Sequence, residues 1–391
     1  MRLGTWIPSF ARAADALAWF GGVRVSEATA CRRSEAAGAA LVALETAEAE
    51  RLAAETPAPP AGPRVQQLSA DGAMVPLVGG EWAEVKTLAI GEVVATRDAD
   101  GGPVVRTTAV SYVSRLADSG TFGRLALVET HRRGTAAAGT VAAVLDGSVW
   151  LQILVDLHRP DAVRILDFPH AVEHLSAAVQ ATFGIGAVET AAWLALHAHE
   201  LKHGDPDAVL AAVRALPVHD AADPAAAAVA RDQALGYLTA RREQIDYARF
   251  QALGLPIGSG MVESANKLVV EERLKGPGMH WAPPHVDPML ALRCAVCNDR
   301  WDEVWPTIAR SLRRPPDPCP TRARRPVGLS AHQASRPATR AARPPRLRVA
   351  PMPVREPRSV DGRPTDAHPW KIAARRGAEH KAARSAQFTK I

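Results

Sequence analysis

The sequence predicts a mixed α/β fold in which a group of strands precedes a long helical region. Three segments rich in Val, Ile, Leu and Thr follow one another over residues 65–113, which is typical of consecutive strands. The wholly apolar segment Thr140–Leu145 lies between predicted helices, as a central, helix-covered strand does. Residues 171–255 then show only helical patterns with short breaks. This order indicates a sheet interrupted by a helical insertion.

Length and composition indicate a soluble protein of several domains. The 391 residues suffice for two to three domains. Apolar runs stay below the roughly 18 residues that a membrane span needs. The first residues lack a signal-peptide pattern, and four cysteines in so long a chain fit a reducing cytoplasm. We therefore expect a cytoplasmic protein without a membrane partner.

The net charge of +6 is the sum of two parts of the chain that carry opposite net charge. Residues 311–391 hold 19 Lys and Arg against 5 Asp and Glu, and 13 of the 31 prolines. The preceding residues hold 28 basic against 36 acidic side chains. We expect residues 313–391 to form a disordered basic tail rich in Pro and Arg. Such a tail is either a nucleic-acid-binding arm or the product of a GC-rich gene translated past a frameshift.

Residues 1–55 are predicted to be a helical N-terminal segment. Gly21-Gly22 interrupts it, and Ser26 can cap a long helix that runs toward Arg51. A helical hairpin and a helix-turn-helix both fit this pattern. Residues 56–64, which contain four prolines, are predicted to be a linker.

Residues 65–170 form the first part of the predicted core. Strands over Val65–Ser69, Glu84–Ala95 and Arg106–Val113 make an antiparallel meander. A helix over Thr121–Arg133 and strands over Thr140–Leu145 and Val163–Leu166 follow. The order β-β-β-α-β-α-β suggests a ribonuclease H-like mixed sheet.

Residues 171–255 form the predicted helical insertion, and residues 256–312 complete the core. The insertion is expected to contain helices over Ala171–Thr182, Val188–Lys202, Asp207–Leu216 and Asp223–Tyr247. The completing part contains a helix that carries Glu263, followed by helices over Pro284–Asn298 and Arg300–Leu312.

Three carboxylates stand out. Asp71 and Asp146 each end a predicted strand and precede a glycine, and Glu263 lies in the first turn of a helix after Gly258 and Gly260. Three such carboxylates could hold two Mg²⁺ ions about 3.5 to 4 Å apart for phosphoryl transfer. Asp-Gly pairs are also ordinary turns, and an acidic first turn also complements the helix dipole. Asp167, which ends a strand too, is an alternative ligand.

Several short sequence motifs indicate a family resemblance. The chain resembles bacterial insertion-sequence transposases of the ISKra type, which are related to the Mutator-like and ISL-type DDE transposases. The resemblance covers about residues 3–310. The matching strings are Ser69-Ala70-Asp71-Gly72, Leu145-Asp146-Gly147-Ser148-Val149-Trp150, Leu166-Asp167-Phe168-Pro169-His170, Gly258-Ser259-Gly260-Met261-Val262-Glu263-Ser264, Arg273-Leu274-Lys275, Gly278-Met279-His280-Trp281 and Asn298-Asp299-Arg300-Trp301-Asp302-Glu303-Val304-Trp305.

The resemblance implies metal-dependent DNA strand cleavage and strand transfer of an insertion sequence. It implies that Asp71, Asp146 and Glu263 are the catalytic triad and the ligands of two Mg²⁺ or Mn²⁺ ions. It also implies that Asp167 and His170 form a supporting pair, for which a structural hydrogen bond is the alternative. DNA at the element ends and the target would be the partner of a homodimer or higher oligomer, near the bacterial nucleoid.

Four residues near Glu263 are candidates for DNA contacts. Lys267, Arg273 and Lys275 could position phosphates, and Trp281 could stack on a base. The alternatives are a solvated helix face for the basic residues and the core for Trp281.

Two departures from the family lead to a second hypothesis. The chain begins after the paired-cysteine region that family members carry, and its basic tail does not resemble their ending. A truncated or degenerate transposase that binds DNA without catalysis is therefore the alternative function.

Two motifs indicate other chemistry. His199-Glu200-Leu201-Lys202-His203 fits H-E-x-x-H, so a zinc-dependent hydrolase using His199, Glu200 and His203 is a further alternative. Gly204 and Pro206 end that helix at once, and neither an H-x-x-G-x-x-H extension nor a glutamate follows before Glu243. Cys294 and Cys297 form a lone C-x-x-C pair with Cys319 nearby, which is a poor zinc pattern.

Overall fold

The computed structural model describes residues 1–97, 103–313, 359–360 and 363–364. The chain divides into two compact units, Met1–Cys319 and Pro320–Ile391. In the second unit β6 (Ser359–Val360) pairs antiparallel with β7 (Arg363–Pro364). The predicted disordered tail and Cys319 otherwise lie outside the described residues.

The first unit is built on a five-stranded mixed sheet with the strand order β3-β2-β1-β4-β5. β1, β2 and β3 form an antiparallel meander, and β4 and β5 run parallel to β1. The strand bounds are β1 (Val65–Pro76), β2 (Trp82–Arg97), β3 (Pro103–Arg115), β4 (Thr140–Leu145) and β5 (Val163–Leu166). The predicted mixed α/β class, the meander and all five strands are confirmed.

Strand β1 is longer than predicted, so the prediction that Asp71 ends a strand is wrong. Asp71 pairs with Thr87, and the antiparallel ladder continues to Pro76 opposite Trp82. The parallel pairing of β1 with β4 stops earlier, at Leu68 opposite Ala143. Asp71 therefore lies inside β1, just beyond the point where β1 loses its second neighbour.

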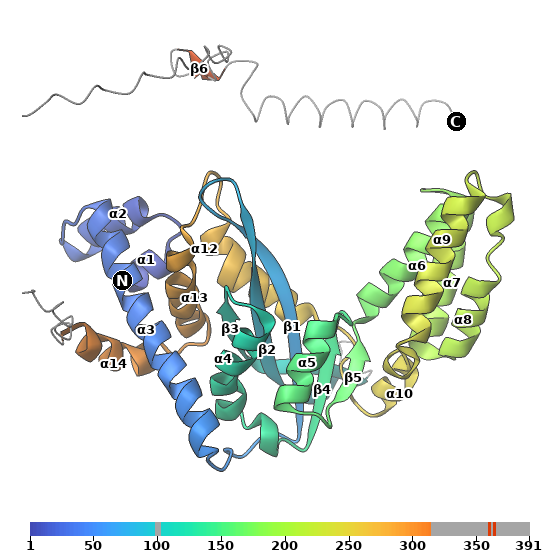
Figure 1. The fold of residues 1–391 in the computed structure, drawn as a ribbon, viewed down its shortest axis with the longest axis horizontal. Helices are drawn as coiled ribbons and strands as arrows, with labels where there is room; N and C mark the ends of the chain where they lie inside the picture. Colours follow the sequence, from blue (N-terminus) through green and yellow to red (C-terminus); the bar gives the residue numbers. More distant parts are fainter. Residues whose placement is uncertain (98–102, 314–358, 361–362, 365–391) are drawn as a thin grey trace, which may run out of the picture. The chain divides into compact units, whose positions relative to one another are not determined.

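Helices α4 (Ser119–Arg132) and α5 (Val149–His158) cover one face of the sheet, in front of it in Figure 1. A 3₁₀ turn, η1 (Thr135–Ala137), leads from α4 to β4. Side chains that alternate along the strands, such as Leu68 and Leu145, pack with Phe122 and Leu151 of these helices. The two-residue period of a strand sends the intervening side chains to the opposite face.

The opposite face of β1 and β2 is covered by a broken helix and by α13 (Pro283–Cys297). The broken helix consists of α11 (Gly260–Ala265), the π-helical segment η4 (Asn266–Glu271) and α12 (Glu272–Leu274). Val75 of β1 packs there with Val269 and Met289. The helix that carries Glu263 is thus held against the sheet.

The N-terminal helices pack on α13. Their bounds, with that of the last helix, are α1 (Arg2–Trp6), α2 (Phe10–Gly21), α3 (Glu27–Glu55) and α14 (Trp301–Arg313). As predicted, Ser26 caps α3 by accepting the Thr29 N–H at 3.2 Å. A Cβ on Gly38 of α3 would collide with the backbone of Pro288, so glycine permits the close approach of α3 to α13.

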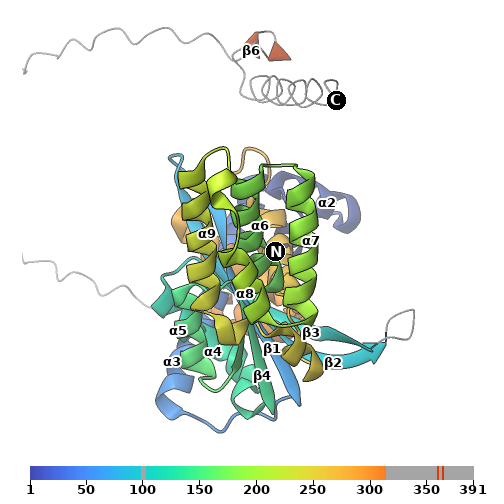
Figure 2. The ribbon, with the colours of Figure 1, turned by 90° about the vertical axis from the view of Figure 1, so that its right-hand side faces the viewer.

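The helical insertion packs on β4 and β5 through a core that includes Ala142, Val144 and Ile165. Figure 2 shows α6, α7, α8 and α9 side by side. The bounds are α6 (Phe168–Phe183), α7 (Val188–His203), α8 (Pro206–Arg214), η2 (Val218–Asp220), α9 (Pro224–Thr239), η3 (Arg242–Gln244) and α10 (Tyr247–Ala252).

The single helix predicted over Asp223–Tyr247 is wrong, because α9 ends at Thr239. The chain then turns back toward the sheet, where the Tyr247 hydroxyl donates to the Leu166 carbonyl at 2.9 Å. A continuous helix would carry Tyr247 away from β5. None of the described helices is both long enough and apolar enough to cross a membrane.

Candidate active site

The register of the parallel strands brings three aspartates to one level of the sheet. Residues 65–68 of β1 each pair with the β4 residue 75 positions later, as Leu68 does with Ala143. Asp71 and Asp146 are also 75 positions apart, so they follow at matching positions on the same face. In the β4–β5 ladder the offset is 21, from Leu145 to Leu166, and Asp167 follows Asp146 by the same 21.

Asp71 is held by two hydrogen bonds. The Gly72 N–H donates to Oδ1 at 2.7 Å, and Asn266 Nδ2 donates to Oδ2 at 2.9 Å. Burial raises the pKa of Asp71, and the negative charges of Asp146 and Glu263 raise it further, against the two hydrogen bonds. The three predicted carboxylates therefore lie close enough to act on one another, in a place that favours positive charge.

Glu263 lies in the first turn of α11, as predicted, and its side chain is exposed. Val262 and Ala265 of the same helix are buried against Ala89 of β2, which anchors α11 on the sheet. Ser259 occupies the predicted N-cap position, but the bond it makes is a backbone one, from its N–H to Asp167 Oδ1 at 2.6 Å.

Asp167 holds the loop before α11 in place. It is 5 % exposed, and its second oxygen accepts the His170 N–H at 3.2 Å, which caps α6. Gln67 of β1 adds a hydrogen bond from Nε2 to the Gly258 carbonyl at 2.9 Å. Asp167 is buried, whereas Asp71 is partly exposed, and the two Asp167 oxygens join two separate backbone segments, so an anchoring role for Asp167 is favoured over a metal ligand.

His170 contacts Asp167 through its backbone, and its imidazole points elsewhere. Its Nδ1 lies 3.3 Å from a carboxylate oxygen of Glu173, and its ring meets that of His174 edge to face at 5.2 Å. The predicted supporting pair is thus joined by a helix-capping hydrogen bond.

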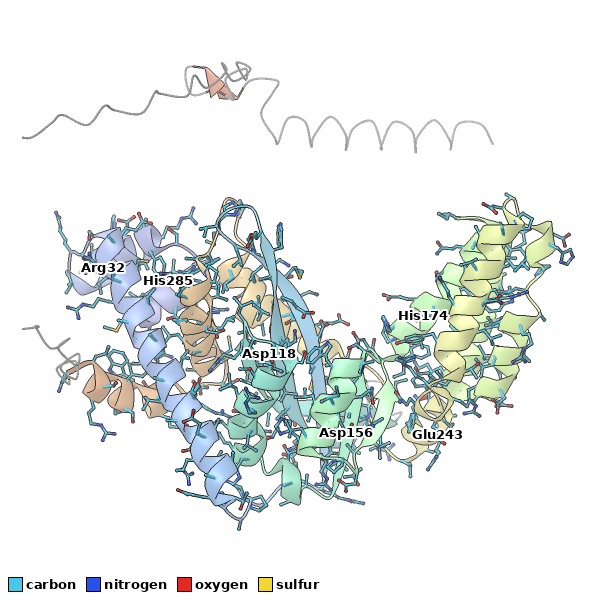
Figure 3. The ribbon with its side chains drawn as sticks, in the orientation of Figure 1. Arg32, Asp118, Asp156, His174, Glu243 and His285 are labelled. Carbon is cyan, nitrogen blue, oxygen red and sulfur yellow. The ribbon has the colours of Figure 1, made fainter. Side chains whose placement is uncertain are left out.

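The helical insertion is hydrogen-bonded to the backbone at Asp146 and Gly147. The Tyr237 hydroxyl donates to the Asp146 carbonyl, and Arg241 Nη2 donates to the Gly147 carbonyl at 2.7 Å. The Arg241 guanidinium lies 3.8 Å from the centre of the Tyr237 ring, and His174 also stacks on Tyr237, at 3.8 Å. Figure 3 labels His174 on the insertion.

Gly147 fits this contact because it lacks a side chain. Its φ is +84°, and an added Cβ would lie against Tyr237 and Arg241. The Ser148 N–H donates to Asp146 Oδ1 at 2.8 Å, so the Asp146 side chain is fixed too. We call Tyr237, Arg241 and Gly147 the Asp146 clamp.

The four predicted DNA contacts divide into two groups. Lys267 is exposed, and Lys275 is partly exposed in an ion pair with Glu271 at 2.7 Å. Arg273, by contrast, is 1 % exposed, and Trp281 is also buried. The expectation of surface contacts is therefore corrected for these two residues.

Arg273 is an interior residue of the second face. Its Nε donates to the Gly4 carbonyl at 3.2 Å, and its guanidinium lies over the rings of Phe10 and Trp281. Burial lowers the pKa of Arg273 to about 10. Trp281 continues the sheet backbone, where its N–H donates to the Pro76 carbonyl at 3.0 Å.

The structure gives little support to zinc binding by the H-E-x-x-H and C-x-x-C motifs. The rings of His199 and His203 lie 4.8 Å apart on α7, but Glu200 accepts the Asp205 N–H where the helix ends. Burial raises the pKa of Cys294 to about 12 and also raises that of Cys297. Burial thus favours thiols, whereas zinc binds thiolates.

The donors around Asp71 and Asp146 fit a hard divalent cation, because carboxylate and amide oxygens are the ligands that Mg²⁺ prefers. In the described ranges, no three His, Cys, Asp or Glu side chains are grouped closely enough to hold a metal ion. Amide oxygens are not among those groups, and Asn266 Oδ1 is a buried acceptor without a partner in the described residues. Asp71 and Asp146, with Glu263 near them, would hold the metal.

Sequence reasoning missed Asn266, Gln67, Tyr237 and Arg241. Asn266 had a signal, since it lies one helical turn after Glu263. Comparison of the chain with protein-family models gave no match, and comparison with curated proteins gave none either. Geometry and the resemblance of the motifs therefore carry the functional argument.

Proposed function

We propose that this chain is a DDE-type transposase with a ribonuclease H-like core, which cleaves and transfers DNA strands in a metal-dependent reaction. One observation carries the proposal: Asp71 and Asp146 follow the paired part of the parallel strands with the same offset of 75, and the helix of Glu263 is hydrogen-bonded to Asp71 through Asn266. The strand order, with a meander before two parallel strands, and the helical insertion before Glu263 support it.

The reaction is two phosphoryl transfers. In the first, a water oxygen bonds to phosphorus while the P–O3′ bond breaks, which leaves a 3′-hydroxyl on the element end. In the second, that 3′ oxygen bonds to a target phosphorus and the target's own 3′ oxygen leaves. A pair of Mg²⁺ or Mn²⁺ ions, when bound, activates the nucleophile and stabilises the leaving oxygen.

The chain's own residues prepare the site for this chemistry. Asn266 and the Gly72 N–H orient Asp71, and the Ser148 N–H orients Asp146. Asp167 and Gln67 hold the loop that leads to Glu263. Exposed Lys267, one turn beyond Glu263, is placed to bind a phosphate. Joining two element ends calls for a dimer or higher oligomer.

The test uses purified full-length protein and linear DNA that carries the sequences flanking its gene. We expect nicking at element ends and joining to a target plasmid in Mg²⁺ or Mn²⁺. Asp71→Asn, Asp146→Asn and Glu263→Gln should each abolish both steps while the circular dichroism spectrum is unchanged. Asp220→Asn, which changes an exposed carboxylate of the insertion, is the matched control.

Three results would reject parts of the proposal. Cleavage by all three variants would exclude the triad. DNA binding without cleavage by the wild type would support the non-catalytic remnant instead. Zinc in the purified protein, together with loss of hydrolysis in His199→Ala, would support the zinc hydrolase.

A further inference from the structure

The side-chain amide of Asn266 binds Asp71 through its nitrogen and leaves its oxygen without a partner in the described residues. The side chain is 7 % exposed, and its Nδ2 donates to Asp71 Oδ2 at 2.9 Å. An ionised carboxylate only accepts hydrogen bonds, so the amide nitrogen must face Asp71 and Oδ1 must face away from it. Oδ1 is buried and has no hydrogen-bond partner in the described part of the chain.

A buried acceptor without a partner is unusual, because most buried polar atoms are paired. The position of Asn266 suggests a role for its Oδ1 atom. Asn266 follows Glu263 by three residues, so the two lie on the same side of the helix, and the Asn266 side chain reaches Asp71. The π-helical segment η4 begins at Asn266, and such segments often occur at functional positions.

A second buried oxygen lies two residues along the chain from Asp146. Ser148 Oγ, two residues after Asp146, has no hydrogen-bond partner in the described residues either. Asp71 and Asp146 are thus each accompanied by an unused polar oxygen. A hard cation takes carboxylate and Asn carbonyl oxygens together, which is the pair of donors that Asp71 and Asn266 supply.

We propose that Asn266 is a metal-site residue, in which Nδ2 holds Asp71 in position and Oδ1 is an oxygen ligand for the divalent cation. The proposal rests on the proposed function, since it assumes that Asp71 and Asp146 bind that cation. It adds an amide oxygen donor beside Asp71, near a Glu263 side chain that is exposed in this structure.

Direct binding of Mn²⁺ to the full-length protein, measured by electron paramagnetic resonance without DNA, tests the proposal. Asn266→Ala should weaken Mn²⁺ binding by about 10- to 100-fold, as loss of a residue that supports a metal site does. Asn266→Asp should bind Mn²⁺ at least as tightly as the wild type. Ser264→Ala, an exposed change two residues earlier on the helix, should leave the affinity unchanged.

Thermal melting separates a metal role from a merely structural one. Without metal, Asn266→Asp should melt below the wild type, because a second carboxylate then faces Asp71. Saturating Mn²⁺ should raise its melting temperature by more than it raises that of the wild type. An equal deficit with and without Mn²⁺ would show a structural residue and overturn the proposal, as would wild-type Mn²⁺ affinity in Asn266→Ala.

Asp71→Asn and Asp146→Asn distinguish this inference from the proposed function. If both variants bind Mn²⁺ as tightly as the wild type, the proposed function itself fails. If they lose affinity while Asn266→Ala keeps it, only the role of Asn266 is rejected.

Discussion

Asp71 and Asp146 are separated by the same 75 positions that separate every residue pair in the parallel β1–β4 ladder. Continued past the last paired residues, this register puts both carboxylates at one level, and burial together with the negative charge of Asp146 raises the pKa of Asp71. Residues that act as one unit in catalysis do not contribute additively. We expect Asp71→Asn and Asp146→Asn each to lower the strand-cleavage rate on the order of 10³-fold or more, and the double variant to lower it no further. Single-turnover rates measure this, and additive losses would contradict a shared site.

The Asp146 clamp predicts that Gly147 is intolerant of a side chain. Gly147→Ala should destabilise the protein and lower cleavage, because the added Cβ meets Tyr237 and Arg241 at a positive φ. Gly186→Ala is the matched control, since Gly186 has φ +80° with nothing within 4 Å of an added Cβ. The difference between their urea midpoints isolates the clamp contact.

Removal of the Tyr237 hydroxyl tests the same contact without backbone strain. Tyr237→Phe leaves the Asp146 carbonyl without this donor, which should cost about 1 to 3 kcal/mol of unfolding free energy. An unchanged urea midpoint in Tyr237→Phe would show that the hydroxyl does not hold the Asp146 backbone.

Loss of the Asp167 side chain should lower the unfolding free energy by more than loss of an ordinary helix cap does. Asp167→Ala removes the acceptor of both the Ser259 and the His170 N–H groups, and we expect a loss of about 2 to 4 kcal/mol. Asp205→Ala, which removes a solvent-exposed cap of α8, should cost about 1 kcal/mol. Chemical denaturation measures both. Equal losses would mean that the bond to Ser259 adds little.

Arg273 should contribute to protein stability, whereas Lys267 should contribute to DNA binding. Arg273→Ala should lower unfolding free energy by about 3 kcal/mol, because a buried side chain between Phe10 and Trp281 is lost. Lys267→Ala should leave stability unchanged and reduce the salt dependence of DNA binding by about one unit of slope. Fluorescence anisotropy over a range of NaCl concentrations measures the slope. A reversed pattern would restore the surface role of Arg273.

His158 should make the protein sensitive to mild acid. Its Nε2–H donates to the Gly123 carbonyl, and burial lowers the pKa of His158 to about 4. A histidine whose pKa is lowered by folding gives stability that is present above its unfolded pKa of about 6.5 and is lost as pH falls toward 4. Over that range the loss should be on the order of 3 kcal/mol. His158→Gln should flatten the curve of urea midpoint against pH between 6.5 and 4. An unchanged slope would assign the acid sensitivity to other groups.

The elements of the fold could be predicted because their signals are local. The alternating β-branched residues of β2 and the apolar run of β4 mark those strands, and Ser26 marks the start of α3. The end of β1 could not be predicted from the Asp71-Gly72 pair, since the ladder with β2 decides it. The turn after α9 likewise accompanies distant bonds, from Tyr247 to Leu166 of β5 and from Arg241 to Gly147 just after β4.

The sequence by itself determined which carboxylates to consider and on which elements they lie, because periodicity, capping and glycine placement act over a few residues. Only the tertiary structure decided the common level of Asp71 and Asp146, the anchoring bonds of Asp167 and the burial of Arg273. The physical reason is distance along the chain. Asn266 lies 195 residues from the Asp71 that it binds, and Tyr237 lies 91 from Asp146, so no local pattern records either contact.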